Sequence, residues 1–198
     1  DLIRLKNKSG EWELGQIPDI QGALVSMSPR NGAIRALVGG YDFRRSQVNR
    51  VTTPRPPGSN FKPFLYGAAL ENGYSPASII NDAPITRGNY RPNNYENNFL
   101  GPITLRYALK ESRNVPAVRL YDELGADIVL PFAAKFGFQT QNFPTNDLTI
   151  ALGSRDVQPL EIATAYSAIA NGGYKVNPWF IQKIMSDKDG LLYEAKPR

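Results

Sequence analysis

The stretch Pro57-Gly58-Ser59-Asn60-Phe61-Lys62-Pro63-Phe64 places a serine three residues before a lysine at the start of a helix. Proline and glycine resist helix before Ser59, whereas the apolar residues that follow repeat at helical spacing as far as Asn72-Gly73. Pro63 fits this placement, because proline is tolerated in a first turn but breaks a helix interior. We therefore predict a helix that begins at or next to Ser59 and presents Ser59 and Lys62 on one face.

Ser59 is a candidate nucleophile, and Lys62 is its candidate base. The Ser-x-x-Lys pattern is a weak signal by itself, because such pairs also arise by chance in a chain of this length. The chain has no histidine, so it cannot assemble a Ser-His-Asp relay or use a histidine base. It also has no cysteine, which excludes thiol catalysis and disulfides and disfavours a zinc site. An activated serine here needs another base, and we expect no metal and no cofactor.

The composition is that of an ordinary globular domain. A chain of 198 residues, with 41% apolar and 21% charged residues, can bury one sizeable core. The net charge is +5, with a local concentration at Arg44, Arg45, Arg50 and Arg55. No recognised nucleic-acid-binding fold or stacking motif accompanies these arginines, so we interpret them as a solvated basic face and expect no nucleic-acid partner. The sequence contains no apolar run long enough to span a membrane, and its first residues do not resemble a signal peptide.

A hairpin is predicted ahead of the serine. Two strand-like segments, 22–27 and 33–38, flank Pro29-Arg30-Asn31-Gly32. Asn-Gly between such segments is a strong hairpin signal, because it accepts positive backbone angles.

Strands are also predicted at both ends of the sequence. Residues 1–18 alternate around Lys8-Ser9-Gly10, and we interpret them as the strand and linker tail of a preceding module. Residues 174–195 are typical of strands around the turn Asp187-Lys188-Asp189-Gly190. Calcium binding at that turn is a weak alternative, because the later ligands of an EF-hand are absent.

Four further helices and one long loop are predicted between these ends. The helices cover 104–111, 116–124, 127–136 and 159–170, with proline, glycine or asparagine at their boundaries. Residues 81–102 are rich in Asn, Pro, Gly and Tyr and lack sustained periodicity. They predict a long ordered loop or the wall of a cleft.

A second polar triplet, Ser112-Arg113-Asn114, lies between two of the predicted helices. Taken alone, it is best explained by helix ends, with Asn114 capping the following helix and Ser112 closing the preceding one. Its position downstream of the Ser-x-x-Lys pattern favours a functional interpretation instead.

The two motifs in this order resemble those of the penicillin-recognising serine acyltransferases. The surrounding sequence looks like the class A penicillin-binding proteins over roughly residues 20–198, and an ordered series of this kind is highly specific. The segments that carry the resemblance are Asn31–Gly40, Pro57–Phe64, Leu105–Leu109, Ser112–Arg119 and Ala168–Gly173.

The resemblance implies an α+β fold, that of the penicillin-binding protein and serine β-lactamase-like transpeptidases. Residues 19–198 would form the N-terminal portion of the transpeptidase domain, a helical subdomain with the first strands of the central antiparallel sheet. The family's Lys-Thr-Gly motif is absent from the sequence, and Lys8-Ser9-Gly10 precedes Ser59, opposite to the family order. Two strands alone are marginal and expose an edge. We therefore expect the later strands to be missing, and the chain to be an excised fragment or half of a nicked domain bound to its C-terminal remainder.

The resemblance further implies D,D-transpeptidation. Ser59 attacks the carbonyl between the terminal D-alanines of a peptidoglycan stem peptide, and an amine of a neighbouring stem then takes the acyl group. Lys62 removes the serine proton, which requires its pKa to fall from about 10.4 to roughly 7 or 8. Ser112 relays a proton to the departing D-alanine, and Asn114 orients Lys62 and binds the substrate backbone. The Ser59 backbone N–H supplies half of the oxyanion hole.

The implied partners are peptidoglycan stem peptides and β-lactam antibiotics, which acylate Ser59. The implied parent protein is also a peptidoglycan glycosyltransferase, held by an absent N-terminal anchor at the periplasmic face of the bacterial inner membrane. One alternative is a D,D-carboxypeptidase or β-lactamase, for which Glu96 and Glu111 are candidate deacylation bases. We expect instead that Glu96 is a solvated surface acid and Glu111 a helix-end charge. The other alternative is a penicillin-binding sensor or scaffold without turnover.

Overall fold

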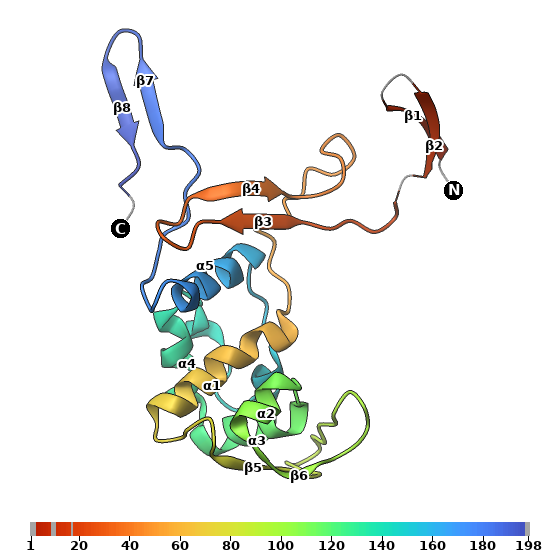
Figure 1. The fold of residues 1–198 in the computed structure, drawn as a ribbon, viewed down its shortest axis with the longest axis vertical. Coiled ribbons are helices and arrows are strands. Elements are labelled where there is room, and N and C mark those ends of the chain that lie inside the picture. Colours follow the sequence, from red (N-terminus) through yellow and green to blue (C-terminus); the bar gives the residue numbers. More distant parts are fainter. Residues whose placement is uncertain (1–2, 9–10, 17, 197–198) are drawn as a thin grey trace.

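The helices pack into one body with a buried core in the computed structural model, and paired strands lie around this body (Figure 1). The structure describes residues 3–8, 11–16 and 18–196. Within them the α-helices are α1 (Lys62–Glu71), α2 (Leu105–Lys110), α3 (Asn114–Leu124), α4 (Ala126–Lys135) and α5 (Pro159–Ala170). Three short 3-10 helices are η1 (Gly58–Phe61), η2 (Thr140–Asn142) and η3 (Leu148–Leu152).

The strands of the described residues form four antiparallel pairs. The strands are β1 (Ile3–Lys8), β2 (Glu11–Gln16), β3 (Leu24–Met27), β4 (Ile34–Val38), β5 (Ile79–Asp82), β6 (Gly101–Thr104), β7 (Lys183–Ser186) and β8 (Gly190–Glu194). Each strand pairs with its neighbour in the sequence, and the β1–β2 and β7–β8 hairpins project from the helical body (Figure 1). The α+β class and the strands at both ends are confirmed. Ser9 and Gly10 of the predicted first turn lie outside the described residues, and the preceding-module interpretation stays a prediction.

The β3–β4 hairpin has the predicted turn, and Gly32 is essential to it. Gly32 has a φ of 77°, in the left-handed region that favours glycine. Its N–H donates to the Ser28 carbonyl at 2.9 Å. A Cβ at this position would lie 2.1 Å from the Asn177 carbonyl oxygen, so a larger residue cannot be accommodated without moving that segment.

Helix α1 runs through the core, between α3, α4 and η3. Phe64 and Leu65 are completely buried. The Phe64 ring meets three further aromatic rings edge-on, those of Phe136, Phe138 and Tyr166, at centroid distances of 5.0, 4.8 and 5.5 Å. Edge-on aromatic pairs add to the burial of apolar area, so α1 is firmly fixed. Its first residue, Lys62, is thereby held in place.

The predicted helices are confirmed, with small shifts at their ends. Helix α3 begins at Asn114, before the predicted start at Pro116. Ser59 lies in η1, a tighter turn that leads into α1, and the α-helix itself starts at Lys62. Two prolines explain this order, because Pro57 precedes η1 and Pro63 occupies the first turn of α1, where its missing N–H is not needed.

The long loop predicted at 81–102 is shorter than expected. Its two ends pair as β5 and β6, with Ile80 opposite Ile103 and Asp82 opposite Gly101. The pattern was missed because Pro102 and Gly101 are poor strand residues, and only tertiary packing reveals the pair. The segment between the strands remains a loop without regular structure and lies beside α3 and α2 (Figure 1).

The β3–β4 hairpin is tied to the segment that follows α5. The Ile34 N–H donates to the Trp179 carbonyl at 2.7 Å, and the Trp179 indole donates to the Asn31 carbonyl at 2.7 Å. Asn171, at the end of α5, donates its amide to the Pro29 carbonyl at 2.8 Å. These bonds hold the hairpin over α5, as Figure 1 shows.

Candidate active site

Ser59 lies on a turn that is held by contacts with the core and with α5. The Lys62 N–H donates to the Ser59 carbonyl, which joins η1 to α1. Phe61, within the same turn, is 1% exposed and packs into the core. On the side of α5, the Tyr166 hydroxyl donates to the Asn60 carbonyl at 3.1 Å. The backbone around the candidate nucleophile is therefore rigidly placed.

A close contact between two glycines fixes the start of this turn. The Gly58 N–H donates to the Gly153 carbonyl at 3.1 Å. Gly153 has a φ of 70°, and a Cβ there would lie 2.1 Å from the Gly58 carbonyl oxygen. The position after η3 therefore needs glycine both for its backbone angle and for the space beside the nucleophile turn.

The Ser59 side chain is exposed, as a nucleophile that meets a substrate must be. Among the described residues, none forms a hydrogen bond with its hydroxyl. The structure thus places Ser59 in the turn that leads into Lys62, three residues before it, without a hydrogen bond between Oγ and Nζ. Such bonds are often loose in an enzyme without its substrate and tighten in the complex.

Lys62 is buried, and its ammonium is surrounded by oxygen atoms. The side chain is 1% exposed. Its Nζ donates to the Ser112 carbonyl at 2.6 Å, to the Ser112 hydroxyl at 3.2 Å and to the Asn114 Oδ1 at 2.8 Å. The structure therefore brings together three of the four predicted site residues by direct contact.

The surroundings of Lys62 favour its neutral form. Burial lowers the pKa of Lys62 from 10.5 to about 8, because an ammonium loses solvation when it leaves water. The Glu96 carboxylate acts in the opposite direction. A pKa near 8 leaves a useful fraction of neutral amine close to neutral pH, as a general base requires.

Ser112 adopts a backbone conformation that most residues avoid. Its φ is 50°, in the left-handed region. The Ser112 N–H donates to the Leu109 carbonyl at 3.0 Å, and the Arg113 N–H donates to the Ala108 carbonyl at 2.9 Å. This pattern is the Schellman motif that closes a helix, and glycine normally occupies the position that Ser112 has here. The unusual residue is explained by the two contacts that Ser112 makes with Lys62.

Asn114 opens α3 and uses both ends of its amide. Its Oδ1 accepts the bond from Lys62, and its Nδ2 donates to the Asn93 carbonyl at 3.1 Å. Asn114 is therefore not the cap of α3, because its own backbone is already helical and Arg113 occupies the cap position.

Several residues that support the site were not assigned a role from the sequence. Arg113 is 4% exposed and pairs with Asp82 at 2.7 Å and with Glu96 at 2.9 Å. Asn94, also buried, connects the loop to α3. The asparagine-rich composition of the loop was the available signal, but no local pattern shows that Asp82 is buried.

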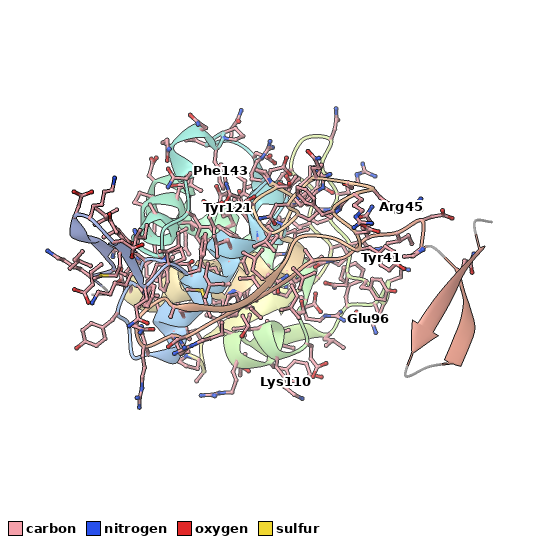
Figure 2. All side chains as sticks on the ribbon, turned by 90° about the horizontal axis from the view of Figure 1, so that it is seen from above. Tyr41, Arg45, Glu96, Lys110, Tyr121 and Phe143 are labelled. Atoms are coloured by element: carbon pink, nitrogen blue, oxygen red, sulfur yellow. The ribbon has the colours of Figure 1, made fainter. Side chains whose placement is uncertain are left out.

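The two glutamates considered as deacylation bases are both paired. Glu96, labelled in Figure 2, is 53% exposed, so its expected exposure is correct, but the sequence did not reveal its ion pair with Arg113. Glu111 pairs with the exposed Lys110 at the end of α2 at 2.9 Å. The expectation of a helix-end charge at Glu111 is confirmed.

Neither a metal centre nor a spanning helix is evident in the part of the chain that the structure describes. Within these residues, no group of three or more acidic side chains is arranged to hold a metal ion. None of the described helices is both long and apolar enough to cross a membrane.

Comparison with known proteins agrees with this geometry. The family described as the penicillin binding protein transpeptidase domain matches residues 22–197. Penicillin-binding protein 1A of Pseudomonas aeruginosa is 47% identical over 205 residues, which cover 100% of this chain and 25% of that protein. Penicillin-binding protein 1A of Escherichia coli is 44% identical, over 99% of this chain and 24% of that protein. The chain thus spans about a quarter of the length of these curated relatives.

Solved structures show the same fold. The crystal structure of penicillin-binding protein 1A from Haemophilus influenzae has a TM-score of 0.89 and 37% identity, over 99% of this chain and 30% of that one. The PonA1 protein from Mycobacterium tuberculosis in complex with penicillin V has a TM-score of 0.80 and 27% identity, over 89% of this chain and 51% of that one. These findings confirm the resemblance and the fold that the motifs predicted. The chain belongs to the penicillin-binding protein transpeptidase family.

Proposed function

We propose that this chain carries the acylating half of a D,D-transpeptidase that cross-links peptidoglycan stem peptides through an acyl-enzyme on Ser59. The observation that carries the proposal is the position of Lys62, which is buried directly after the Ser59 turn and enclosed by Ser112 and Asn114. A buried lysine whose pKa is lowered, close to a serine, is a candidate general base, because burial of an unpaired ammonium is costly for a residue with only a structural role.

In the first step, neutral Lys62 takes the Ser59 proton while Oγ attacks the carbonyl between the two D-alanines. The new C–O bond forms and the peptide C–N bond breaks, with D-alanine leaving as the amine. The proton held by Lys62 passes to that nitrogen, and the Ser112 hydroxyl, 3.2 Å from Nζ, can receive one proton while it donates another. An amine of a second stem then attacks the acyl-enzyme and restores the Ser59 hydroxyl.

Asn114 has an orienting role in this scheme. Its amide oxygen, 2.8 Å from Lys62 Nζ, fixes the direction of the amine. The Ser59 N–H, near the start of α1, provides one oxyanion donor. Loss of one such donor costs about 10²- to 10³-fold in rate, so a second donor matters greatly. The sequence has no Lys-Thr-Gly, and we propose that a longer protein supplies that motif and the second donor.

The proposal extends to the parent protein by likeness to its relatives. We propose a bifunctional peptidoglycan synthase with glycosyltransferase and transpeptidase activities, at the periplasmic face of the inner membrane. The transpeptidase family match and the name penicillin-binding protein 1A of the relatives in P. aeruginosa and E. coli support the transpeptidase part, and the glycosyltransferase part rests on the resemblance to class A penicillin-binding proteins. The PonA1 complex with penicillin V supports β-lactams as ligands of the same site.

A hydrolase or a sensor would use the same motifs, but the acyl-enzyme on Ser59 would be hydrolysed or would persist. Rapid turnover of a β-lactam requires an activated deacylation water. The two nearby glutamates considered for that task are engaged in ion pairs with Arg113 and Lys110, which supports a transferase. Release of β-lactam product would indicate a hydrolase, and stable acylation without cross-linked product would indicate a sensor.

The test is intact mass measurement after treatment with a penicillin, followed by peptide mapping of the adduct. It is performed on the 198-residue chain and on the parent protein that contains it. We expect one penicilloyl group on Ser59 in the parent protein. The 198-residue chain alone should label poorly, because only the parent protein provides a complete oxyanion hole. Absence of a Ser59 adduct in the folded parent protein would contradict the proposed function.

A further inference from the structure

A buried polar network lies behind the Ser112-Arg113-Asn114 turn and connects it to the loop between β5 and β6. Its central members are Asp82, Asn94 and Arg113, which are 0%, 2% and 4% exposed. Charged and amide side chains are seldom buried to this extent unless each polar atom has a partner. Burying these three side chains costs free energy, which indicates that the network has a role in positioning the residues it contacts.

Asp82 is the acceptor that holds the network together. Its Oδ1 accepts from the Asn94 amide at 2.7 Å. Its Oδ2 accepts from the Arg113 Nε at 2.8 Å and from the Leu100 N–H at 3.2 Å. Removing one partner from a buried ion pair is strongly destabilising, because the remaining charge is left without compensation. The Arg113 side chain therefore cannot leave its place without a large cost.

Asn94 extends the network to the start of α3. Its Oδ1 accepts from the backbone N–H groups of Asn114 at 2.9 Å and Val115 at 3.1 Å. The cap residue of α3, Arg113, makes no side-chain cap bond of its own. A side chain from a remote loop thus provides the cap that the local sequence lacks, and it does so at the residue that contacts Lys62.

The neighbouring Asn93 determines which end of the Asn114 amide faces Lys62. Its carbonyl accepts from Asn114 Nδ2 at 3.1 Å. A carbonyl can only accept, so the nitrogen of the amide faces the loop and the oxygen faces the amine. The orientation of the Asn114 oxygen toward Lys62 is therefore determined by the loop.

We propose that Asp82 and Asn94 are positioning residues, which act through the Ser112-Arg113-Asn114 turn to hold the oxygens of Ser112 and Asn114 on the Lys62 amine. Neither residue touches the reacting atoms. Asp82 holds Arg113, which follows the left-handed Ser112, and Asn94 holds the backbone of Asn114. The inference rests on the proposed role of Lys62 as a base and names the residues that prepare it for that role.

The ionisable groups around this network come from several elements. They are Asp82 at the end of β5, Glu96 on the loop, Arg113 before α3, and Tyr66 on α1, whose pKa burial and Asp82 both raise. The Glu96 carboxylate raises the pKa of Lys62 and is more than half exposed. A change at the uncharged Asn94 leaves all these charges in place, so it tests positioning without adding or removing a charge.

The main test compares Asn94→Ala with Asn171→Ala. Asn171 is the matched control, because its amide also makes several bonds to backbone, with Pro29 and Tyr174, at the far end of α5. We expect Asn94→Ala in the parent protein to slow β-lactam acylation of Ser59 by up to about 100-fold, the effect of a small misplacement at a catalytic group. Asn171→Ala should leave that rate unchanged. Equal rates in both variants and the wild type would overturn the inference.

A second readout does not depend on acylation. The titration of Lys62 is followed by NMR in the 198-residue chain with carbon-13 in its lysines. In Asn94→Ala, water reaches the amine, and we expect the midpoint to rise from about 8 toward its ordinary value. A midpoint equal to that of the wild type would overturn the inference. If the wild-type parent fails to form a Ser59 adduct, the proposed function is wrong, but this titration still decides the positioning role.

If Asn94→Ala fails to fold, the milder variant Asn94→Ser replaces it, and thermal unfolding is measured for every variant.

The double exchange of Asp82→Asn with Asn94→Asp adds a specific prediction. Asn94→Asp alone places two carboxylates 2.7 Å apart, judged from the present Asn94 to Asp82 distance, and is the most damaging change. The paired exchange restores one donor and one acceptor, and we expect it to recover part of the lost rate. Recovery of this kind would not follow from a general loss of stability.

Discussion

The two turns that form the site are held in different ways. The Ser59 turn is held mainly by its own residues, Pro57 before it and Phe61 packed into the core, together with one backbone contact with Gly153. The Ser112 turn is closed by local backbone bonds to Leu109 and Ala108, but the residues that follow it are held by Asp82 and Asn94 of another segment. Local sequence can therefore specify a nucleophile, whereas the residues that prepare its base depend on tertiary structure.

The largest expected effect concerns Lys62, which follows the Ser59 turn in the chain and contacts the Ser112 turn. Lys62→Met keeps the length and burial of the side chain and removes the amine. We expect acylation of Ser59 by a penicillin to fall about 10²- to 10⁴-fold, the usual contribution of a general base. Stopped-flow or mass-resolved acylation kinetics provide the measurement. A rate within a factor of two of the wild type would show that Lys62 is not the base.

The same variant tests the linkage between pH and stability. The folded-state pKa of Lys62 is lowered to about 8, so the unfolded chain binds more protons than the folded chain between about pH 8 and 10.5. The stability of the wild type relative to Lys62→Met should therefore rise by about 3 kcal/mol from pH 8 to pH 10.5, and this gain should be lost as the pH falls back to 8. Denaturant unfolding at several pH values measures the difference, and a flat difference would contradict the lowered pKa.

At Ser112, a single substitution is expected to change stability and activity in opposite directions. Ser112→Gly removes the hydroxyl and places the preferred residue at a φ of 50°. We expect acylation to slow about 100-fold, while the free energy of unfolding increases by up to about 1 kcal/mol. Ser112→Ala is the control, because it removes the same hydroxyl but keeps the backbone penalty. A glycine variant less stable than the alanine variant would contradict this interpretation of the turn.

Gly153→Ala tests the local support of the nucleophile turn. The added methyl meets the Gly58 carbonyl and also requires an unfavourable φ, so we expect a loss of about 1 to 3 kcal/mol in stability. Movement of Gly58 displaces Ser59, and acylation should slow about tenfold. Gly172→Ala is a control with a φ of 85° and open space around it, which should lose stability without slowing acylation of the folded protein.

The smallest effect on the acylation rate is expected at Glu96, where a substitution should accelerate the reaction and not slow it. Glu96 raises the pKa of Lys62, so Glu96→Gln should lower it and leave more neutral amine below pH 8. Acylation at pH 7 should then accelerate by a few-fold, since the rate follows the neutral fraction. The pH dependence of the rate measures the shift. A slower reaction with an unchanged midpoint would indicate that the Arg113 pair matters more than the charge near Lys62.

Much of the fold followed from local signals in the sequence. Proline, glycine and apolar spacing located α1 and α5, and Asn31-Gly32 located the β3–β4 hairpin. The motifs also gave Lys62, Ser112 and Asn114, which the structure brings into contact. Helix ends and turns are short-range features, so their residues are visible without a structure.

The rest of the site could not be obtained in this way. Asp82 and Asn94 lie in a segment that reads as a polar loop, and nothing in its composition distinguishes a buried asparagine from an exposed one. Their importance comes from partners such as Arg113, far along the chain. The strand pairing of Pro102 was missed for the same reason, because it depends on contact with β5.

The indole of Trp179 bonded to the Asn31 carbonyl also bears on the order of folding. That bond joins residues separated by 148 positions, so it must close a loop that includes all of the described helices. Helices form from neighbours within microseconds, whereas contacts at such separation wait for the chain between them to become compact. We therefore expect the β3–β4 hairpin to dock after the helical body has formed. Amide hydrogen exchange during refolding should protect α1 before Ile34.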